Sequence, residues 1–494
     1  MLRPFAPFTY SLTEAAELLS AEKKNFSEMD FTGIAHIDSD VEVGDLFLAF
    51  PGAKTHGAKF IESAKEHGAI AVLTDNAGAE FSKSLPTLIV KNAREAGAML
   101  ATSFYHSPIR DLQSIGITGT NGKTTVSTLL YQIFMQVGRE SGLIGTVESR
   151  IGVDRISSKR TTPEAAELQA LAATMRERHM RHLVMEVSSH SIELKRLIGS
   201  HFAIVGFTNL SQDHLDFHQD MESYFAAKSK LFTHEYAELG FINIDSIYGD
   251  RLFKSAAIPT IAISRFNKEA TWHFTEITAT SFGADFVIRG NDGVLIESKT
   301  PMRGSFNLDN LLLATAIAYE CGVDPLELAS ILPSLFGAPG RLESINVGQN
   351  FSALVDYAHS PDAVINVLQA VREFTTGRVI SVLGCGGDRD STKRSPMGIA
   401  LAKGSDIAIF TSDNPRSESP ESILSQMTAD VELVPPSEIC IDRKEAILRA
   451  VNLATAGDTV IVLGKGHELG QEVNGVVTPF DDRIELALAI EAKK

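Results

Sequence analysis

A glycine-rich segment, "GITGTNGKTT" (Gly116 to Thr125), has the composition of a phosphate-binding loop. It follows a short apolar run typical of a buried strand and precedes a helical pattern, the order that such a loop requires. Its glycines let backbone N–H groups approach phosphate oxygens, Lys123 can neutralise the β- and γ-phosphates, and the Thr124 hydroxyl can bind Mg²⁺. The spacing is GxxGKT, because the longer GxxxxGK pattern would need glycine at Ile117. The alternative is a turn that only caps a helix, but the context favours ATP or GTP binding.

Two further apolar runs end in residues that could bind a metal or a phosphate. Glu186, in "MEVSSH", lies inside an apolar strand pattern, where a carboxylate is expected to have a cation partner. The segment "TNLSQDHLDFH" follows another such run and offers Asp213, His214, Asp216 and His218. An isolated segment of this kind could equally be a turn capped by aspartates. Since these segments follow strands like the glycine-rich loop does, we expect them to converge on one metal–phosphate site.

A helical stretch, "YFAAKSKLF" (Tyr224 to Phe232), adds two lysines, Lys228 and Lys230. Composition alone predicts that both are exposed to solvent.

Alternating apolar runs and helical patterns organise the whole chain and predict an α/β fold of three domains. Residues 1–107 form a small N-terminal α/β domain, and residues 108–338 a central domain with a mostly parallel, P-loop-type sheet covered by helices on both faces. Residues 339–494 form a C-terminal Rossmann-like α/β domain, which begins at the glycine- and proline-rich loop signal Gly337-Ala-Pro-Gly340.

Composition limits the kind of protein. A net charge of −17 over 494 residues argues against a general nucleic-acid or anionic-membrane surface. Cys321, Cys385 and Cys440 are scattered without metal-site spacing, so we expect no disulfide framework and a reducing compartment. The start, Met1-Leu-Arg-Pro-Phe, predicts no signal peptide, and no apolar run is long enough to predict membrane insertion. A cytoplasmic, monomeric protein is the expectation.

The motifs, taken in order, resemble those of the Mur ligases, the ATP-dependent amide-forming enzymes of peptidoglycan precursor synthesis. The resemblance covers nearly the whole chain, and so many ordered matches are far more specific than any one of them. The matching motifs are TGTNGKTT at 118–125, TTPE at 161–164, MEVSSH at 185–190, NLxQDHLDFH at 209–218, AAKxxLF at 226–232, GxFNxxN at 304–310, PGRLE at 339–343, DYAHxP at 356–361, GCGGDRD at 384–390, DNPRSE at 413–418 and GKGHE at 464–468.

Within that family the resemblance is to the tripeptide-forming ligase, which implies a two-step reaction. The D-glutamyl carboxylate of UDP-N-acetylmuramoyl-L-alanyl-D-glutamate attacks the γ-phosphorus of ATP, and the amine of 2,6-diaminopimelate then displaces phosphate from the acyl phosphate. The implied cofactor is Mg²⁺. The implied catalytic residues are Lys123, Glu186, His214 and a carbamylated Lys228, and the implied metal ligands are Thr124, Glu186, His214 and Lys228.

The resemblance also implies three sets of binding residues. ATP would contact Gly119, Thr120, Asn121, Gly122, Lys123, Thr124, Thr125, Asn310, Arg341, Asp356, Tyr357 and His359. The UDP-substrate would contact Ser39, Thr161, Thr162, Ser188 and Arg196. The incoming amino acid would contact Arg389, Asp413, Asn414, Pro415, Arg416, Gly464 and Glu468.

The sequence departs from the family pattern at several of these sites. Asp40 replaces a common arginine and Leu194 a common glutamine, which affects the uridine-side contacts. Leu469-Gly470 replaces the aspartate–tyrosine common in diaminopimelate enzymes, which leaves L-lysine or ornithine open as the added amino acid. Arg416 favours diaminopimelate, because a guanidinium pairs with its distal carboxylate and would face a lysine ammonium unfavourably.

Two other functions remain open. A folylpolyglutamate synthetase-type ligase shares the ATP-binding plan, but the long segment before the phosphate loop and the DNPRSE motif favour the muramoyl ligase. The other is a nucleotide-binding module without catalysis, against which the intact set Lys123, Glu186, His214 and Lys228 argues.

Overall fold

The structure is a computed structural model that describes residues 2–52, 55–152, 154–158, 160–280 and 283–493. By backbone contacts the chain divides into two compact units. The first holds the residues up to Thr275 together with Ile288–Ile296 and Leu312–Ile331. The second holds Glu276–Val287, Glu297–Leu311 and Leu332–Lys494.

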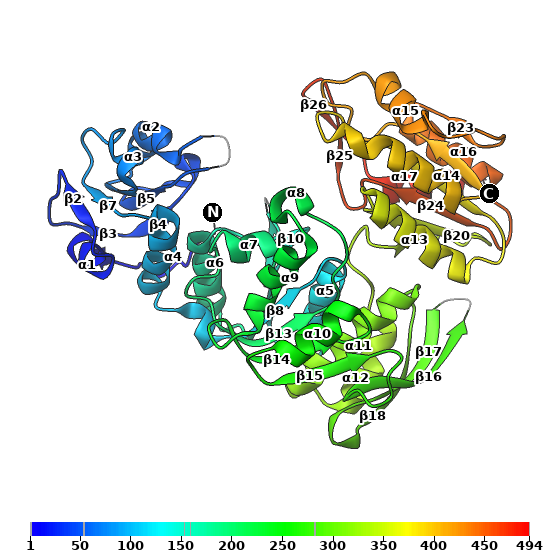
Figure 1. The fold of residues 1–494 in the computed structure, drawn as a ribbon, viewed down its shortest axis with the longest axis horizontal. Coiled ribbons are helices and arrows are strands. Elements are labelled where there is room, and N and C mark those ends of the chain that lie inside the picture. The colour runs from blue at the N-terminus through cyan, green and yellow to red at the C-terminus, as the bar shows by residue number, and fades with distance from the viewer. Residues whose placement is uncertain (1, 53–54, 153, 159, 281–282, 494) are drawn as a thin grey trace. The chain divides into compact units, whose positions relative to one another are not determined.

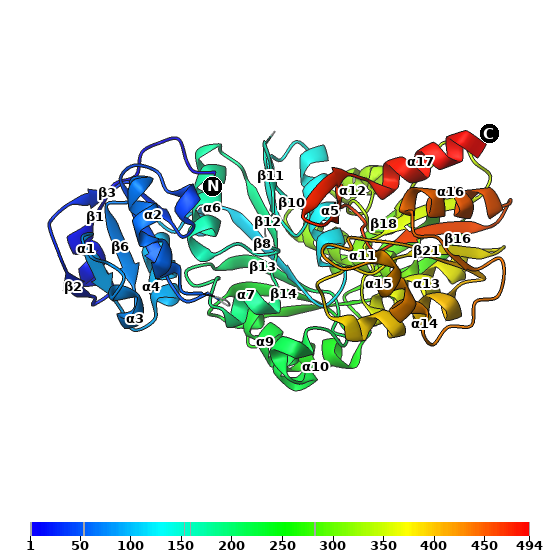
Figure 2. The same ribbon diagram turned by 90° about the horizontal axis from the view of Figure 1, so that it is seen from above.

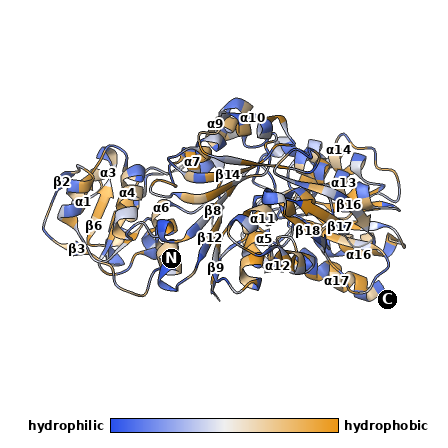
Figure 3. Ribbon diagram, turned by 90° about the horizontal axis from the view of Figure 1, so that it is seen from below, coloured by the Kyte–Doolittle hydropathy of each residue, from blue (hydrophilic) through white to orange (hydrophobic). Residues whose placement is uncertain are grey.

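The first unit begins with a five-stranded sheet, drawn in blue in Figure 1. Its order is β2 (Glu22–Lys24), β7 (Thr87–Ile89), β6 (Ala71–Thr74), β5 (Asp45–Ala49) and β4 (Gly33–Ala35). Only β2 runs antiparallel to its neighbour. Figure 3 shows β6, in the middle of this sheet, as hydrophobic, whereas the helices beside it carry both kinds of residue. These helices are α1 (Leu12–Leu18), α2 (Ile61–Glu66), α3 (Asn76–Ala79) and α4 (Ala93–Phe104), and a short β1 (Tyr10–Ser11) pairs with β3 (Asp30–Phe31).

The central sheet has eleven strands and a parallel core that continues from β9 to β16. Its order is β11 (Asp154–Ser157), β10 (Glu148–Ile151), β9 (Ser141–Ile144), β12 (His182–Glu186), β8 (Gln113–Thr118), β13 (Phe202–Phe207), β14 (Ala237–Asn243), β15 (Thr260–Ser264), β16 (Trp272–Thr280), β17 (Gly283–Arg289) and β18 (Leu295–Thr300). Strands β10 and β11 are antiparallel additions at one edge.

Helices cover both faces of this sheet. Figure 2 shows α5 (Lys123–Gln136) and α12 (Pro325–Ile331) on one side of β8, β13 and β14, and α9 (Met221–Ser229) and α10 (Ile247–Ser255) on the other. The remaining helices are α6 (Ala165–Glu177), α7 (Ser189–Glu193), α8 (Leu215–His218) and α11 (Ser305–Glu320). Strands β8, β12 and β13 are parallel neighbours, so their carboxyl ends lie at the same edge of the sheet. The glycine-rich loop, Glu186 and Thr208 all lie at this edge.

The second unit is built on a six-stranded sheet. Its order is β19 (Glu343–Ser344), β20 (Ser352–Asp356), β24 (Thr459–Leu463), β21 (Val379–Leu383), β22 (Ile407–Phe410) and β23 (Glu438–Ile439), all parallel except β19. Figure 2 shows α13 (Pro361–Phe374), α14 (Arg394–Gly404) and α15 (Pro420–Thr428) on one face, and α16 (Arg443–Leu453) and α17 (Asp482–Lys493) on the other. Two apolar clusters fill the two faces, and a hairpin, β25 (Gly470–Val473) and β26 (Val476–Pro479), follows β24.

The predicted α/β architecture is confirmed, and the residues of each predicted domain contain one sheet of five or more strands. The predicted boundary at 107 falls between α4 and a short 3-10 helix, Pro108–Asp111, and that at 338 falls in the loop before β19. The three cysteines are free and buried, which agrees with the expected lack of a disulfide framework. Across the described residues, every helix is too short or too polar to cross a bilayer.

Candidate active site

The glycine-rich loop is closed by hydrogen bonds with Thr208 and Asn209, which directly follow β13. Gly119 has φ +145°, and a Cβ at that position would lie 1.9 Å from the Thr208 hydroxyl, so another residue could not adopt this loop. The Asn121 amide donates to Asn209 Oδ1 (3.0 Å), and the Thr208 hydroxyl donates to the Asn121 carbonyl (2.6 Å). Helix α5 then begins at Lys123, which places the loop at a helix N-terminus, the setting of an anion site.

Two lysine side chains meet at this loop. Lys123 Nζ donates to the carbonyls of Gly119 (3.0 Å) and Thr120 (2.8 Å), and Lys228 Nζ donates to the same Gly119 carbonyl (2.8 Å). Lys228 is 1% exposed and lies 4.8 Å above the Tyr224 ring. Burial, and secondly the charge of Lys123, lower the pKa of Lys228 well below its usual value. The composition-based prediction that Lys228 is exposed is therefore wrong, whereas Lys230 is half-exposed and pairs with Glu193.

A carboxylate and two hydroxyls converge beside the loop. Glu186, at the end of β12 and 1% exposed, accepts from Thr124 Oγ1 (2.9 Å), Thr146 Oγ1 (3.0 Å) and the Thr146 amide (2.7 Å). These three bonded donors are neutral, and the expected cation partner of Glu186 stays a prediction. The Glu186 carboxylate and the Thr124 hydroxyl offer hard oxygen ligands, which fits Mg²⁺ bound through few protein oxygens plus phosphate and water.

The DHLDFH segment folds over the same edge of the sheet. His214, half-exposed with φ +53°, lies with its ring 4.9 Å from that of His190 and its Nδ1 3.5 Å from an Asp213 oxygen. His218 is buried, forms a hydrogen bond with the Ser189 hydroxyl and stacks on Tyr224. These contacts indicate that His218 stabilises the fold of this segment. The side chain of Asp216 lies outside what the structure describes. Over the described residues, no three His, Cys, Asp or Glu side chains form a metal cluster, so the predicted metal ligands remain predictions.

Four of the five residues predicted to contact the UDP-substrate lie close together. Thr162 Oγ1 donates to the Glu186 carbonyl (2.9 Å) and accepts from the Ser188 amide (3.1 Å), while Arg196 Nη1 donates to the Thr162 carbonyl (3.3 Å). The Thr161 hydroxyl lies 3.0 Å from that of Thr146, the residue that also holds Glu186. Ser39, the fifth, is exposed in a 3-10 helix, Asp38–Asp40, that follows β4.

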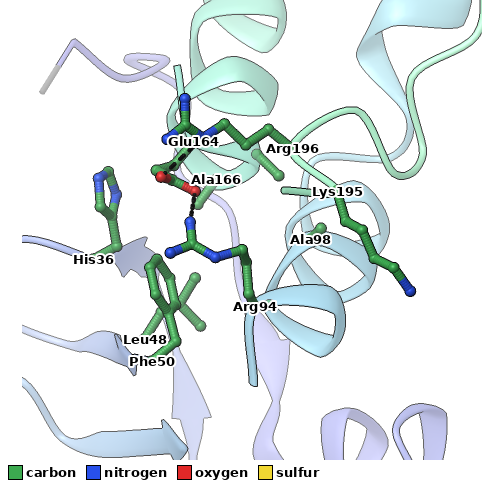
Figure 4. A pocket seen from close by; sticks show the side chains of 11 residues that line it. His36, Leu48, Phe50, Arg94, Ala98, Glu164, Ala166, Lys195 and Arg196 are labelled. Carbon is green, nitrogen blue, oxygen red and sulfur yellow. Dashed lines mark hydrogen bonds and ion pairs between the residues drawn. The ribbon is translucent and has the colours of Figure 1, made fainter. Parts of the chain in front are cut away.

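A small pocket of the first unit lies beside these residues (Figure 4). Glu164 is shared by two guanidinium groups, with Arg196 Nε 3.0 Å from Oε1 and Arg94 bonded to Oε2. Burial raises the pKa of Glu164, but the two arginines outweigh it and hold the pKa below its usual value. His36 also lines this pocket, and burial lowers its pKa to about 4, so this imidazole is neutral near pH 7.

In the second unit, an aromatic group follows β20. The Asp356 carboxylate accepts from the amides of Leu342 (2.7 Å) and Ala358 (2.8 Å), and burial raises its pKa. Tyr357 lies 4.8 Å from the Arg341 guanidinium and 4.7 Å from the His359 ring. Three residues predicted to bind ATP, namely Arg341, Tyr357 and His359, thus lie together around the Tyr357 ring. Asn310 is buried in α11 and donates to Asn307.

The DNPRSE and GKGHE motifs meet at the carboxyl ends of β22 and β24. Lys465, fully buried, donates to Asn414 Oδ1 (3.0 Å) and Glu468 Oε2 (3.1 Å), and Asn414 Nδ2 donates to the same Glu468 oxygen (2.8 Å). Burial raises the pKa of Asp413, which lies 3.7 Å from Lys465 Nζ. A Cβ on Gly464 (φ +107°) would lie 2.8 Å from Asp413 Oδ2, so this glycine permits the close approach of the two loops.

The predicted amino-acid residues are therefore largely brought together. Asn414, Glu468, Asp413 and Gly464 form one network, Pro415 is buried next to them, and Arg416 follows in the same loop. Arg389 is exposed in the loop after β21. The sequence analysis did not single out Thr146, Tyr224 or Lys465 as functional residues. Of these three, Lys465 could have been found, because it lies inside the GKGHE motif.

A fully buried ion pair stabilises the loops that carry the DNPRSE and GKGHE motifs. Arg443, the first residue of α16, forms two 2.7 Å bonds with Asp482. The same guanidinium donates to the carbonyls of Ser412 (3.2 Å) and Leu463 (2.8 Å), which directly precede Asp413 and Gly464.

We expect Arg443→Leu to destabilise the C-terminal sheet by about 3–5 kcal/mol, because it leaves Asp482 buried without its counter-ion. Calorimetry of the whole chain measures the loss. Arg372→Leu is the matched control: Arg372 and its partner Asp406 are 44% and 43% exposed, so the loss is about 1 kcal/mol or less. Equal losses in the two variants would contradict the expectation.

Comparisons with known proteins agree with this geometry. Residues 32–105 match the Mur ligase family catalytic domain, residues 117–318 the Mur ligase middle domain, and residues 340–466 the Mur ligase glutamate ligase domain. The chain is 47% identical, over 99% of its length and 98% of the relative's, to the UDP-N-acetylmuramoyl-L-alanyl-D-glutamate–2,6-diaminopimelate ligase of Streptomyces coelicolor. The chain belongs to the Mur ligase family.

Solved structures extend the comparison. This Mur ligase matches a structure of a UDP-N-acetylmuramoyl-L-alanyl-D-glutamate–2,6-diaminopimelate ligase with a TM-score of 0.68 and 32% identity, covering 98% of this chain and 99% of that one. A Mycobacterium tuberculosis folylpolyglutamate synthase matches with a TM-score of 0.57 and 18% identity, covering 74% of this chain and 91% of that one, which shows a shared fold alone. The prediction of a Mur-type ligase is confirmed, and the roles of individual residues remain predictions.

Proposed function

We propose that this Mur ligase adds meso-2,6-diaminopimelate to the D-glutamyl carboxylate of UDP-N-acetylmuramoyl-L-alanyl-D-glutamate, with cleavage of ATP to ADP and phosphate. The observation that carries the choice of amine is the loop at the end of β22, where Arg416 lies beside the Asn414–Glu468 network. A guanidinium next to carboxylates offers partners for both charges of an amino-acid head group. The proposed domains are 1–107 for the UDP-substrate, 108–338 for ATP and 339–494 for the amino acid.

The first half-reaction would be promoted at the glycine-rich loop. Backbone amides of the loop and Lys123 would neutralise the phosphates as the D-glutamyl oxygen attacks the γ-phosphorus and the bond to ADP breaks. Thr124, Glu186, His214 and Lys228 would hold Mg²⁺, which supplies Lewis-acid stabilisation of the transferring phosphoryl group when it is bound. Thr161, Thr162, Ser188, Arg196 and Ser39 would hold the UDP-substrate.

The second half-reaction forms the amide bond. The amine nitrogen attacks the acyl carbon, a tetrahedral intermediate forms, and phosphate leaves with the electron pair of the broken C–O bond while the nitrogen loses a proton. The chain's own contribution is to align the amine and to exclude water, because water would hydrolyse the acyl phosphate. Asp413, Asn414, Pro415, Arg416, Arg389, Gly464 and Glu468 would hold the amine.

L-lysine is the second candidate for the added amino acid. The observation that favours it is the sequence after Glu468, where Leu469-Gly470 departs from the diaminopimelate pattern. Lysine has no distal carboxylate for Arg416, so we rank it below diaminopimelate.

The reaction would take place in the cytoplasm, where ATP is available, with the protein acting as a monomer. The test supplies ATP, Mg²⁺, the UDP-muramoyl dipeptide and one of three amines: diaminopimelate, L-lysine or L-ornithine. We expect phosphate release only when all components are present, and highest turnover with diaminopimelate. Release without any amine would indicate a plain ATPase, and turnover with lysine but not diaminopimelate would overturn the choice of amine.

A further inference from the structure

Glu472, on strand β25, forms an ion pair with Arg416. Its Oε2 lies 3.3 Å from Arg416 Nε, and both side chains remain partly exposed, at 36% and 23%. The other side of the guanidinium donates from Nη1 to the Gly387 carbonyl (2.7 Å). The arginine is thus fixed at two atoms and still faces solvent.

The backbone of the β25–β26 hairpin also holds the arginine's loop. The Arg416 amide donates to the Glu472 carbonyl (3.0 Å), and the Asn474 amide donates to the Arg416 carbonyl (2.7 Å). The Glu472 amide donates to Asn414 Oδ1 (3.0 Å). These bonds keep Arg416 in a left-handed conformation (φ +54°), which is uncommon for a residue other than glycine. Residue 472 therefore sets where Arg416 lies and contributes a charge of its own.

The neighbouring carboxylates of Asp413 and Glu468 contact protein groups other than Arg416. Asp413 is buried against Lys465, and one oxygen of Glu468 accepts from both Asn414 and Lys465. Glu472 differs from them because its charged partner, Arg416, is a group that the substrate would itself contact.

We infer that Glu472 is a specificity-determining residue that accepts hydrogen bonds from the distal ammonium of the incoming amino acid, while Arg416 donates to its distal carboxylate. The two side chains form a donor–acceptor pair that is complementary to a zwitterionic head group, whose opposite charges can replace the protein's own contact. The inference rests on the proposed function, since it states which groups of the incoming amino acid the site would recognise. Sequence reasoning stopped at Leu469-Gly470 and did not include this residue.

The test compares two amines that differ only in the distal amino group: diaminopimelate and L-2-aminopimelate, which keeps the reacting amine and the distal carboxylate. The measured quantity is the ratio of kcat/KM for diaminopimelate to kcat/KM for 2-aminopimelate. We expect Glu472→Gln to lower this ratio about tenfold or more, with kcat/KM for 2-aminopimelate little changed, and Glu472→Asp to give an intermediate ratio. Glu445→Gln is the matched control, because Glu445 is a half-exposed partner of Arg449 on α16.

The outcomes separate the two claims. The inference would be overturned if Glu472→Gln and Glu472→Asp kept the wild-type ratio of the two kcat/KM values, even if both values fell together. The proposed function would still stand in that case. Wild-type protein that turns over none of the diamino acids would overturn the proposed function. If Glu472→Gln does not fold, the Glu472→Asp ratio decides alone.

Discussion

Replacing Lys228 with alanine is expected to lower the kcat of ligation by about 10²- to 10³-fold, the effect of removing one group that stabilises transition-state charge. Lys228 is buried against the glycine-rich loop, where burial and Lys123 lower its pKa well below the usual value. A lowered pKa leaves more of the neutral amine near pH 7, and only the neutral amine can add CO₂. The new N–C bond and the loss of one proton give a carbamate anion.

The carbamate would invert the charge at this position. As a cation, Lys228 repels Lys123 and any metal ion near the phosphates; as a carbamate, it is a hard oxygen ligand that attracts both. The resemblance to the Mur ligases implies this modification, and the burial found here gives it a physical reason. Acidification protonates the amine and reverses the addition, so we expect activity lost at low pH to recover when bicarbonate is supplied after neutralisation.

Chemical rescue distinguishes an anion from a cation at position 228. In Lys228→Ala, a short carboxylate such as acetate can enter the vacated space, and we expect it to restore part of kcat. Rescue by methylamine and not by acetate would show that the ammonium is the active form. Lys230→Ala is the control, because Lys230 lies two residues away but pairs with Glu193 at the surface, and its kcat should be unchanged.

Lys228 and Lys230 show which features of the site could be predicted from the sequence. Composition makes Lys228 and Lys230 equivalent, and only the family resemblance separated them before the structure showed one buried and one half-exposed. The convergence of Thr124 and Glu186, by contrast, followed from the sequence alone, because parallel neighbouring strands end at one edge of a sheet.

The residues that sequence reasoning missed depend on pairing between distant segments. Thr146 holds Glu186 from a position 40 residues away, and Glu472 holds Asn414 from 58 residues away. Neither carries a motif of its own, and the hairpin that presents Glu472 is a small addition outside the main sheet. Such contacts are set by how loops close over a strand edge, which local patterns do not encode.

Replacing Arg416 with alanine is expected to lower kcat/KM for diaminopimelate by about 30-fold to several thousand-fold, because a charged group truncated at a binding site costs about 2–5 kcal/mol. The KM for ATP should change little, since Arg416 contacts Gly387 and Glu472 within the amine-site loops. Arg449→Ala is the control: this arginine pairs with Glu438 and Glu445 on the same domain, and its loss should leave every kcat/KM unchanged. Equal losses for ATP and diaminopimelate would contradict a role in reading the amine.

The same variant separates the two candidate amines. Without Arg416, Glu472 retains its negative charge and loses its partner, so the site changes from a neutral pair to an acceptor for a single cation. Lysine presents only an ammonium at its distal end, and diaminopimelate brings a carboxylate that Glu472 would repel. We therefore expect the preference for diaminopimelate over L-lysine to narrow or invert in Arg416→Ala and to return towards the wild-type value in Arg416→Lys. A preference unchanged by both substitutions would mean that other residues distinguish the distal groups, with Arg389 as the next position to replace.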